Sequence, residues 1–131
     1  MIRKMSDGVG LYYETRGEGQ PIIFIGGWRM STPWWQKQFE FFSSFSKIFF
    51  LDMRGYGQSE NTDKGHRMGR HGKDVHDFIH AGDLEQVTLV GWSQGVCDIW
   101  SYIDLYGVDR LKSVVFVDQT PKLLSDDTWK F

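Results

Sequence analysis

Short runs of consecutive apolar residues alternate along the chain with stretches in which apolar residues recur at helical spacing. Runs of this kind are typical of strands that are buried on both faces of a sheet. Strands that alternate with helices predict a parallel sheet with right-handed crossovers. Ahead of them, residues 1–16 alternate around an Asp7-Gly8 turn and predict a hairpin. The apolar runs cover residues 21–25, 47–51, 87–90 and 113–117.

Three helices are predicted, each with an apolar stripe on one side. The first begins with Thr32 as its N-cap and Pro33 in its first position. The second stops near Gly82 and the third ends at Gly107. The stripes consist of Trp35, Phe39 and Phe42 in the first helix, Met68, His71, Val75, Phe78 and Ile79 in the second, and Val96, Trp100 and Ile103 in the third.

Composition and charge narrow the class of protein. The 131 residues indicate a single domain over 1–131. A net charge of -2 gives no electrostatic footprint for nucleic acid or anionic membrane, and no run approaches the roughly 20 apolar residues of a membrane span. One cysteine, Cys97, excludes an internal disulfide and suits a reducing compartment. We therefore expect a cytoplasmic protein without nucleic-acid or membrane partners.

The aromatic content, 16% of the residues, is high for a small domain. So much ring surface predicts exposed apolar patches, which mark a partner surface or a substrate groove. The last clear strand, at 113–117, would also leave a β-rich edge that templates pairing with another chain. We therefore expect a homodimer, with its mode open; cover by the segment beyond Pro121 is the alternative.

The most specific local signal lies at residues 87–95, where an apolar strand runs into Gly-Trp-Ser-Gln-Gly and then into a helix. A serine on such a strand-to-helix turn is a nucleophile elbow, and its flanking glycines let neighbouring backbones approach closely. Ser93 is then the candidate nucleophile, and the Gln94 amide follows it at a helix N-terminus. In the alternative interpretation, the two glycines only permit a tight turn.

Two further landmarks precede the elbow: Gly26-Gly27-Trp28 and the glycine-rich turn at 52–59, Asp-Met-Arg-Gly-Tyr-Gly-Gln-Ser. With all three in this order, the chain resembles the N-terminal half of the α/β-hydrolase fold, in its haloperoxidase- and esterase-like branch. The resemblance covers nearly all of the chain but about half of a usual member. It implies a shortened, mostly parallel sheet of about five to six strands with crossover helices on both faces.

The resemblance assigns the second oxyanion donor to the backbone N–H of Trp28, beside the Gln94 amide. The family commonly has His-Gly where this chain has Gly26-Gly27, and that histidine braces the loop. We therefore expect a more mobile oxyanion loop. The residue before the serine, often histidine in the family, is Trp92 in this chain.

The catalytic acid expected from the resemblance is Asp118, because some members place the acid after the strand that follows the elbow. A polar loop residue or a helix cap is the alternative for Asp118. Asp52 also ends a strand, but in the family's Asp-x-Arg-Gly motif this residue organises the turn together with the arginine, here Arg54. We interpret Asp52 as structural.

The general base is the open point. The family's catalytic histidine follows its eighth strand, which this chain does not reach. A crossover helix begins near the carboxyl edge of the sheet, so His66 and His71 should lie closer to Ser93 than His76 or His80. His71 falls on the apolar stripe, where a core histidine with a satisfied hydrogen bond is the alternative. His76 and His80 share a helix face without a third ligand, so we expect no metal site.

These expectations lead to one leading function and one rival. The leading hypothesis is a serine hydrolase, a carboxylesterase for small, short-acyl esters that needs no cofactor. Ser93 attacks, Trp28 and Gln94 hold the oxyanion, and His71 or His66 with Asp118 moves the proton. The rival is a truncated or pseudo-hydrolase module that works by binding or self-assembly.

Overall fold

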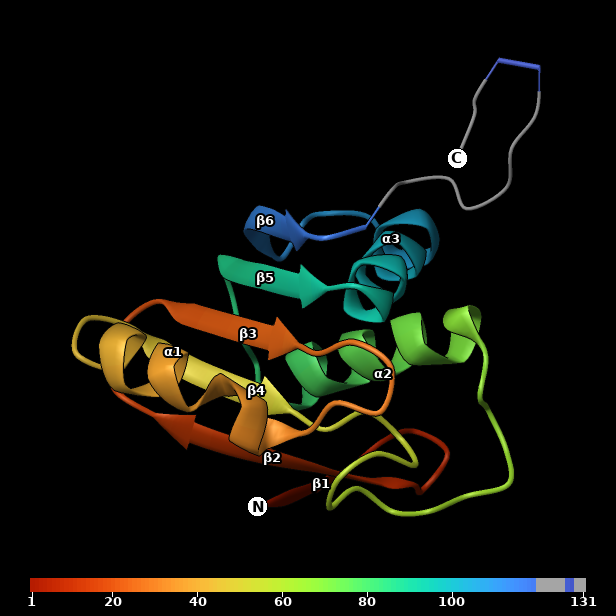
Figure 1. Cartoon of the computed structure of the whole chain (residues 1–131), viewed down its shortest axis with the longest axis horizontal. Helices are drawn as coiled ribbons and strands as arrows, with labels where there is room; N and C mark the ends of the chain where they lie inside the picture. Colours follow the sequence, from red (N-terminus) through yellow and green to blue (C-terminus); the bar gives the residue numbers. More distant parts are fainter. Residues whose placement is uncertain (120–126, 129–131) are drawn as a thin grey trace.

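A computed structural model of the chain describes residues 1–119, 127 and 128. Over these residues, strands and helices alternate after an N-terminal hairpin, and the strands form one sheet in the order β1-β2-β4-β3-β5-β6 (Figure 1). The elements are β1 (Ile2–Lys4), β2 (Gly10–Arg16), β3 (Pro21–Ile25), the 3₁₀ turn η1 (Thr32–Trp35), α1 (Gln36–Phe42), β4 (Lys47–Leu51), α2 (Met68–Ala81), β5 (Val87–Trp92), α3 (Gln94–Tyr106) and β6 (Leu111–Val117).

Strand pairing confirms the predicted sheet. The hairpin strands β1 and β2 are antiparallel, and β2 runs antiparallel to β4. The strands β4, β3, β5 and β6 are parallel neighbours. In this register Ile25 is opposite Gly91, and Trp92 is opposite Val117. The carboxyl ends of β3, β5 and β6 therefore meet at one edge of the sheet, next to the predicted elbow.

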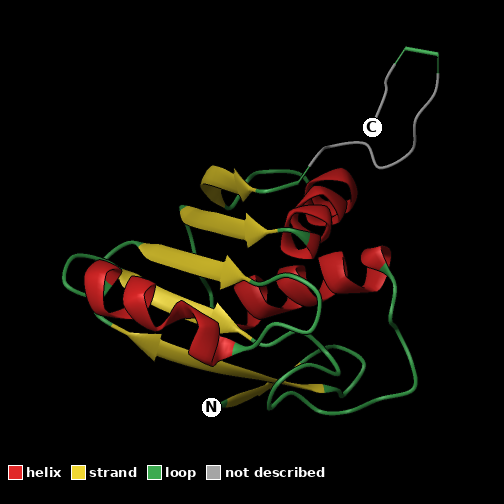
Figure 2. Ribbon diagram, viewed as in Figure 1, coloured by secondary structure: helices red, strands yellow, loops and turns green. Residues whose placement is uncertain are grey.

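Alternate residues of the buried strands pack into two layers, one on each face of the sheet. On one face, Ile23 and Leu89 pack with side chains of α2 and α3. On the other face, Phe24 and Phe50 pack with Trp35 beside α1. Helices thus cover both faces, as predicted: in the described part of the chain, η1 and α1 lie on one side and α2 and α3 on the other (Figure 2).

Three local expectations need correction. The N-cap of the first helical segment is Ser31, and Thr32 is already its first residue. The reason is a tertiary contact: the Thr32 N–H donates to the buried carboxylate of Asp52 at 2.7 Å. Met68 and Trp100, assigned to apolar stripes, are each 40% exposed, because the sheet covers only part of each stripe.

The α1 side of the sheet leaves an open apolar groove over β5 and β6. It has a volume of about 410 Å³. β6 is the last strand of the sheet, and Val115 and Val117 are exposed on it, which confirms the predicted bare edge within the described residues. The segment beyond Pro121, proposed as a cover, lies outside the described residues except for 127 and 128. The groove is lined by Ile22, Phe24, Trp34, Trp35, Gln38, Phe42, Thr88, Val90, Trp92, Val115 and Val117.

Membrane insertion through a helix finds no support: among the described residues, no helix is long and apolar enough to cross a bilayer.

Candidate active site

Ser93 occupies a sharp turn between the end of β5 and the start of α3. Its backbone has φ 52° and ψ -117°, a conformation that side-chain-bearing residues rarely adopt and that costs about 1–3 kcal/mol. Its N–H donates to the carbonyl of Val117 at 2.9 Å, which ties the turn to β6. Strain of this kind persists only where the surrounding structure imposes it. The predicted strand–turn–helix context is therefore present at the carboxyl edge of the sheet.

The two glycines of the motif allow this turn by close backbone contact. A Cβ on Gly95 would overlap the carbonyl oxygen of Ile25 and would lie 2.9 Å from the carbonyl oxygen of Gly26. A Cβ on Gly91 would lie 2.8 Å from the carbonyl carbon of Gly95. The first turn of α3 thus presses against the end of β3, where no side chain fits.

The loop after β3 passes directly beside the serine. A Cβ on Gly27 would lie 3.1 Å from the Cβ of Ser93. The Gly27 N–H donates to the sulfur of Met30 at 3.1 Å, and the Met30 N–H donates back to the Gly27 carbonyl at 3.0 Å. Met30 therefore braces the loop from within, in a chain that lacks the histidine expected to do so.

The two amides assigned to the oxyanion site belong to Trp28, the residue after Gly27, and Gln94, the residue after Ser93. Trp28 is the second residue of the turn closed between Gly27 and Met30, so the turn itself does not use its N–H. Gln94 is the first residue of α3, and the first N–H groups of a helix have no intrahelical acceptor. The Trp28 side chain is 71% exposed. The fold thus places these two segments at one sheet edge.

The predicted acid and bases do not meet the serine in the described part of the chain. Asp118 follows β6, is exposed, and has φ 57°. His66 is exposed, and its Nε2 lies 2.6 Å from the Thr62 carbonyl. His71 is buried. Among the described residues, none of these three side chains has a hydrogen bond to Ser93.

His71 instead faces a carboxylate that the sequence analysis did not single out. Its Nδ1 lies 3.1 Å from Oδ1 of Asp98, which is fully buried on α3. Burial raises the pKa of Asp98, while the hydrogen bond from His71 opposes that rise. The available signal was the i, i+4 spacing of Gln94 and Asp98, which puts both on one side of α3.

A family model for the alpha/beta hydrolase fold matches residues 20–131. The chain belongs to the α/β-hydrolase fold family. This match confirms the resemblance inferred from the three landmarks.

Relatives of this α/β hydrolase include haloperoxidases and esterases. It is 31% identical to the non-heme chloroperoxidase CPO-A1 of Kitasatospora aureofaciens, over 90% of this chain and 43% of that protein. A bromoperoxidase structure from Bacillus anthracis has a TM-score of 0.85 and 32% identity, over 88% of this chain and 43% of that one. An esterase from Exiguobacterium antarcticum has a TM-score of 0.85 and 25% identity over the same shares. The chain spans less than half the length of these relatives.

The glycine-rich turn of this hydrolase is held together by two separate buried carboxylates. Asp52 accepts the N–H groups of Thr32 at 2.7 Å and Gln58 at 2.9 Å, and burial raises its pKa. Arg54 is fully buried and makes two hydrogen bonds of 2.6 and 2.7 Å to Asp74 of α2. These contacts support a structural role for Asp52, but the partner of Arg54 is Asp74 rather than Asp52.

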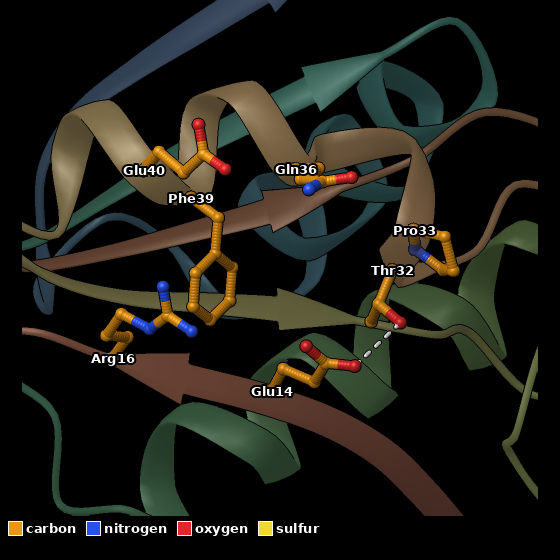
Figure 3. A pocket seen from close by; sticks show the side chains of 7 residues that line it. All are labelled: Glu14, Arg16, Thr32, Pro33, Gln36, Phe39 and Glu40. Atoms are coloured by element: carbon orange, nitrogen blue, oxygen red, sulfur yellow. Dashed lines mark hydrogen bonds between the residues drawn. The ribbon is translucent and has the colours of Figure 1, made fainter.

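A smaller cavity of about 260 Å³ lies away from the elbow, between β2 and α1 (Figure 3). Glu14 accepts a hydrogen bond from the Thr32 hydroxyl at 3.3 Å, and the Arg16 guanidinium lies 4.4 Å from the centre of the Phe39 ring. Neither the elbow nor residues 26–30 of the loop after β3 contribute to the lining. The lining residues are Glu14, Arg16, Thr32, Pro33, Gln36, Phe39 and Glu40.

Proposed function

We propose that this α/β hydrolase is a serine hydrolase, a carboxylesterase that acts on small, short-acyl esters. The observation that carries the proposal is the strained backbone of Ser93 at the carboxyl edge of the sheet, in contact with the loop of Gly27. Strain is retained where function needs a side chain presented in one direction. The esterases among the relatives support the same reaction class.

In the proposed reaction, the Ser93 Oγ attacks the ester carbonyl and loses its proton to a general base. The amides of Trp28 and Gln94 stabilise the negative charge that develops on the carbonyl oxygen. The alcohol leaves with the proton, and water then attacks the acyl-enzyme and releases the acid. No cofactor enters this sequence.

The base is proposed to be a histidine, with His66 and His71 as the candidates in this chain and Asp118 as its proposed orienting acid. Neither histidine is hydrogen-bonded to Ser93 in the described part of the structure, so a base in this chain has to approach when substrate binds. Even without a complete triad, an oxyanion site and substrate binding retain measurable catalysis. We therefore expect a slow esterase.

The second candidate function is a binding or self-assembling module without catalysis. The open groove over β5 and β6, together with the bare edge of β6, favours this alternative. A homodimer would bury the groove and this edge. We propose a homodimer both for the esterase and for the binding module.

The deciding experiment measures hydrolysis of p-nitrophenyl acetate by the wild-type chain, Ser93→Ala and Ser44→Ala. Ser44 is an exposed serine whose hydroxyl bonds only to the nearby Phe41 carbonyl, so its variant is a matched control. We expect Ser93→Ala alone to lose the rate and also to lose covalent labelling by a fluorophosphonate. Equal slow rates and no labelling in all three proteins would overturn the proposal and favour the binding module.

Variants of the two histidines then locate the base. His66→Ala or His71→Ala, whichever removes the base, should lower kcat by at least about 100-fold. Asp118→Asn is then added to the histidine variant that remains active. A further drop in kcat would support Asp118 as the catalytic acid.

A further inference from the structure

A chain of polar side chains leads from the buried interior to the residue next to the nucleophile. The Tyr56 hydroxyl donates to Oε1 of Gln94 at 3.2 Å. This contact turns Nε2 of Gln94 toward His71, where it lies 3.4 Å from Nδ1. Nδ1 in turn lies 3.1 Å from Oδ1 of Asp98. Gln94 and Asp98 belong to α3, and His71 belongs to α2, so the contacts join the two helices below the elbow.

Two atoms of this chain are left without a partner. His71 is 2% exposed and Asp98 is fully buried, yet among the described residues Nε2 of His71 and Oδ2 of Asp98 have no hydrogen-bond partner. Buried polar atoms are nearly always paired, and an unpaired one is costly. Such a pair is sensitive to where its protons are, because each arrangement satisfies different atoms.

The atom that decides is Nδ1 of His71, because it offers either one hydrogen or one lone pair. When Asp98 is ionised, Nδ1–H donates to Oδ1, and no lone pair remains for the Gln94 amide. When Asp98 is protonated, the neutral imidazole carries its hydrogen on Nε2, and the Nδ1 lone pair accepts from both the Asp98 hydroxyl and the side-chain N–H of Gln94. Loss of one proton from the pair, which leaves the remaining hydrogen on Nδ1, therefore removes the acceptor for Gln94 on α2.

We propose that His71 and Asp98 are a positioning pair for the elbow, and that protonation of the pair decides whether Gln94 is held against α2. The backbone N–H of Gln94 is one of the two proposed oxyanion donors. Holding the Gln94 side chain against α2 therefore affects the stabilisation of the oxyanion rather than the attack by Ser93. This inference rests on the proposed function for its effect on rate, but not for the contact itself. In this role His71 acts through Gln94, so that of the two candidate bases in this chain His66 would take the proton of Ser93.

Burial and the neighbouring His71 act on the pKa of Asp98 in opposite directions. Burial raises the pKa of Asp98, the hydrogen bond and charge of His71 lower it, and Asp74 raises it further. Asp74 is itself paired with Arg54 and Arg70, which limits its influence. The titratable groups that face the pair are Asp74 from α2, Cys97 from α3 and Tyr56 from the loop between β4 and α2.

The test follows the side chains directly by NMR and compares wild type with Asp98→Asn and Asp104→Asn. Asp104 is an exposed aspartate of the same helix and serves as the matched control. As pH rises, we expect the His71 ring nitrogens and the Gln94 side-chain amide to shift together in wild type and Asp104→Asn. In Asp98→Asn, which cannot ionise at this position, the Gln94 shift should disappear. A Gln94 signal that ignores pH in wild type, or that responds equally in Asp98→Asn, would overturn the proposal.

Ester hydrolysis gives the second readout. Across the same pH range, the ratio of the wild-type kcat to the Asp98→Asn kcat should change by about 5-fold, while KM stays unchanged. This factor corresponds to the free energy of one neutral hydrogen bond. A loss of 100-fold or more in His71→Gln at every pH would identify His71 as the base and overturn the positioning role. If Ser93 is neither labelled nor active while the Gln94 side-chain signal still depends on pH in wild type and not in Asp98→Asn, the proposed function fails and the positioning pair stands.

Asp98→Asn could prevent folding, so Tyr56→Phe provides an independent variant. It removes the hydroxyl that orients the Gln94 amide and leaves the buried pair intact. We expect the coupled shift of Gln94 to shrink in Tyr56→Phe, and an unchanged shift would contradict the proposed chain of contacts.

Discussion

Adding one methyl group at Gly95 should destabilise this fold more than any surface change. The new Cβ would overlap the carbonyl oxygen of Ile25 and lie 2.8 Å from its carbonyl carbon. Both are backbone atoms of a central strand, so the clash cannot be relieved by a side-chain rotation. Overpacking costs about 1–3 kcal/mol where side chains can adjust. We expect Gly95→Ala to lose about 2–4 kcal/mol of unfolding free energy.

The matched control is Gly69→Ala, the same substitution in the first turn of α2. A Cβ on Gly69 meets nothing within 4 Å. Alanine there should raise stability by about 0.5 kcal/mol, because it limits the unfolded chain and favours the helix. The two variants therefore differ in sign, although the chemical change is identical.

Urea denaturation followed by circular dichroism measures both variants against wild type. Gly95→Ala should lower the midpoint without a large change in slope, and its thermal midpoint should fall by roughly 10 °C. A loss below about 0.5 kcal/mol for Gly95→Ala would show that α3 can move away from β3 freely. The close contact described for the elbow would then be refuted.

Three further predictions concern other parts of the fold. Ser93→Gly should raise unfolding free energy by about 1 kcal/mol in urea titrations, because glycine adopts a φ of 52° without strain, and it should abolish ester hydrolysis. Arg54→Met leaves Asp74 buried beside one fewer cation and should cost about 3 kcal/mol, with Arg54→Lys losing less; equal stability of Arg54→Met and wild type would contradict this. Partial burial would raise the pKa of Asp77, but hydrogen bonds from Ser6, Lys73 and His76 together outweigh it and lower that pKa. Asp77 therefore stabilises the fold above its unfolded pKa of about 3.9 and loses that contribution as pH falls below it, so Asp77→Asn should flatten the acid limb of stability between about pH 4 and 2.

The sheet and its helices could be predicted because each depends on a local pattern. Apolar runs such as 21–25 and 48–51 are compatible with little except central strands, and both lie in strands of the structure. Exposure was harder to predict. A helical stripe shows which side of α3 is apolar, but not how far the sheet extends under that side. Trp100 is therefore only partly covered by the sheet, where it packs against Phe116.

The candidate site likewise contains residues that the sequence predicts and one contact that it does not. Ser93, Trp28 and Gln94 follow from strand ends and glycines, which sequence displays directly. The pairing of His71 with Asp98 depends on how closely α2 and α3 approach. That approach is set by Gly72, where a Cβ would lie 2.8 Å from the Tyr102 backbone nitrogen. The distance between two packed helices cannot be predicted from the spacing of residues along the sequence.

The hydrogen bond from Ser93 N–H to the Val117 carbonyl has a consequence for dynamics. It links the amide of Ser93, the proposed nucleophile, to the outermost strand of the described sheet, whose other side has no neighbour there. Outer strands open first in native-state fluctuations. Each fraying event at the end of β6 would therefore release the backbone of the serine as well. The rate of hydrogen exchange at the Ser93 amide should therefore report how often that edge opens, and any strand that pairs with β6 should slow this exchange.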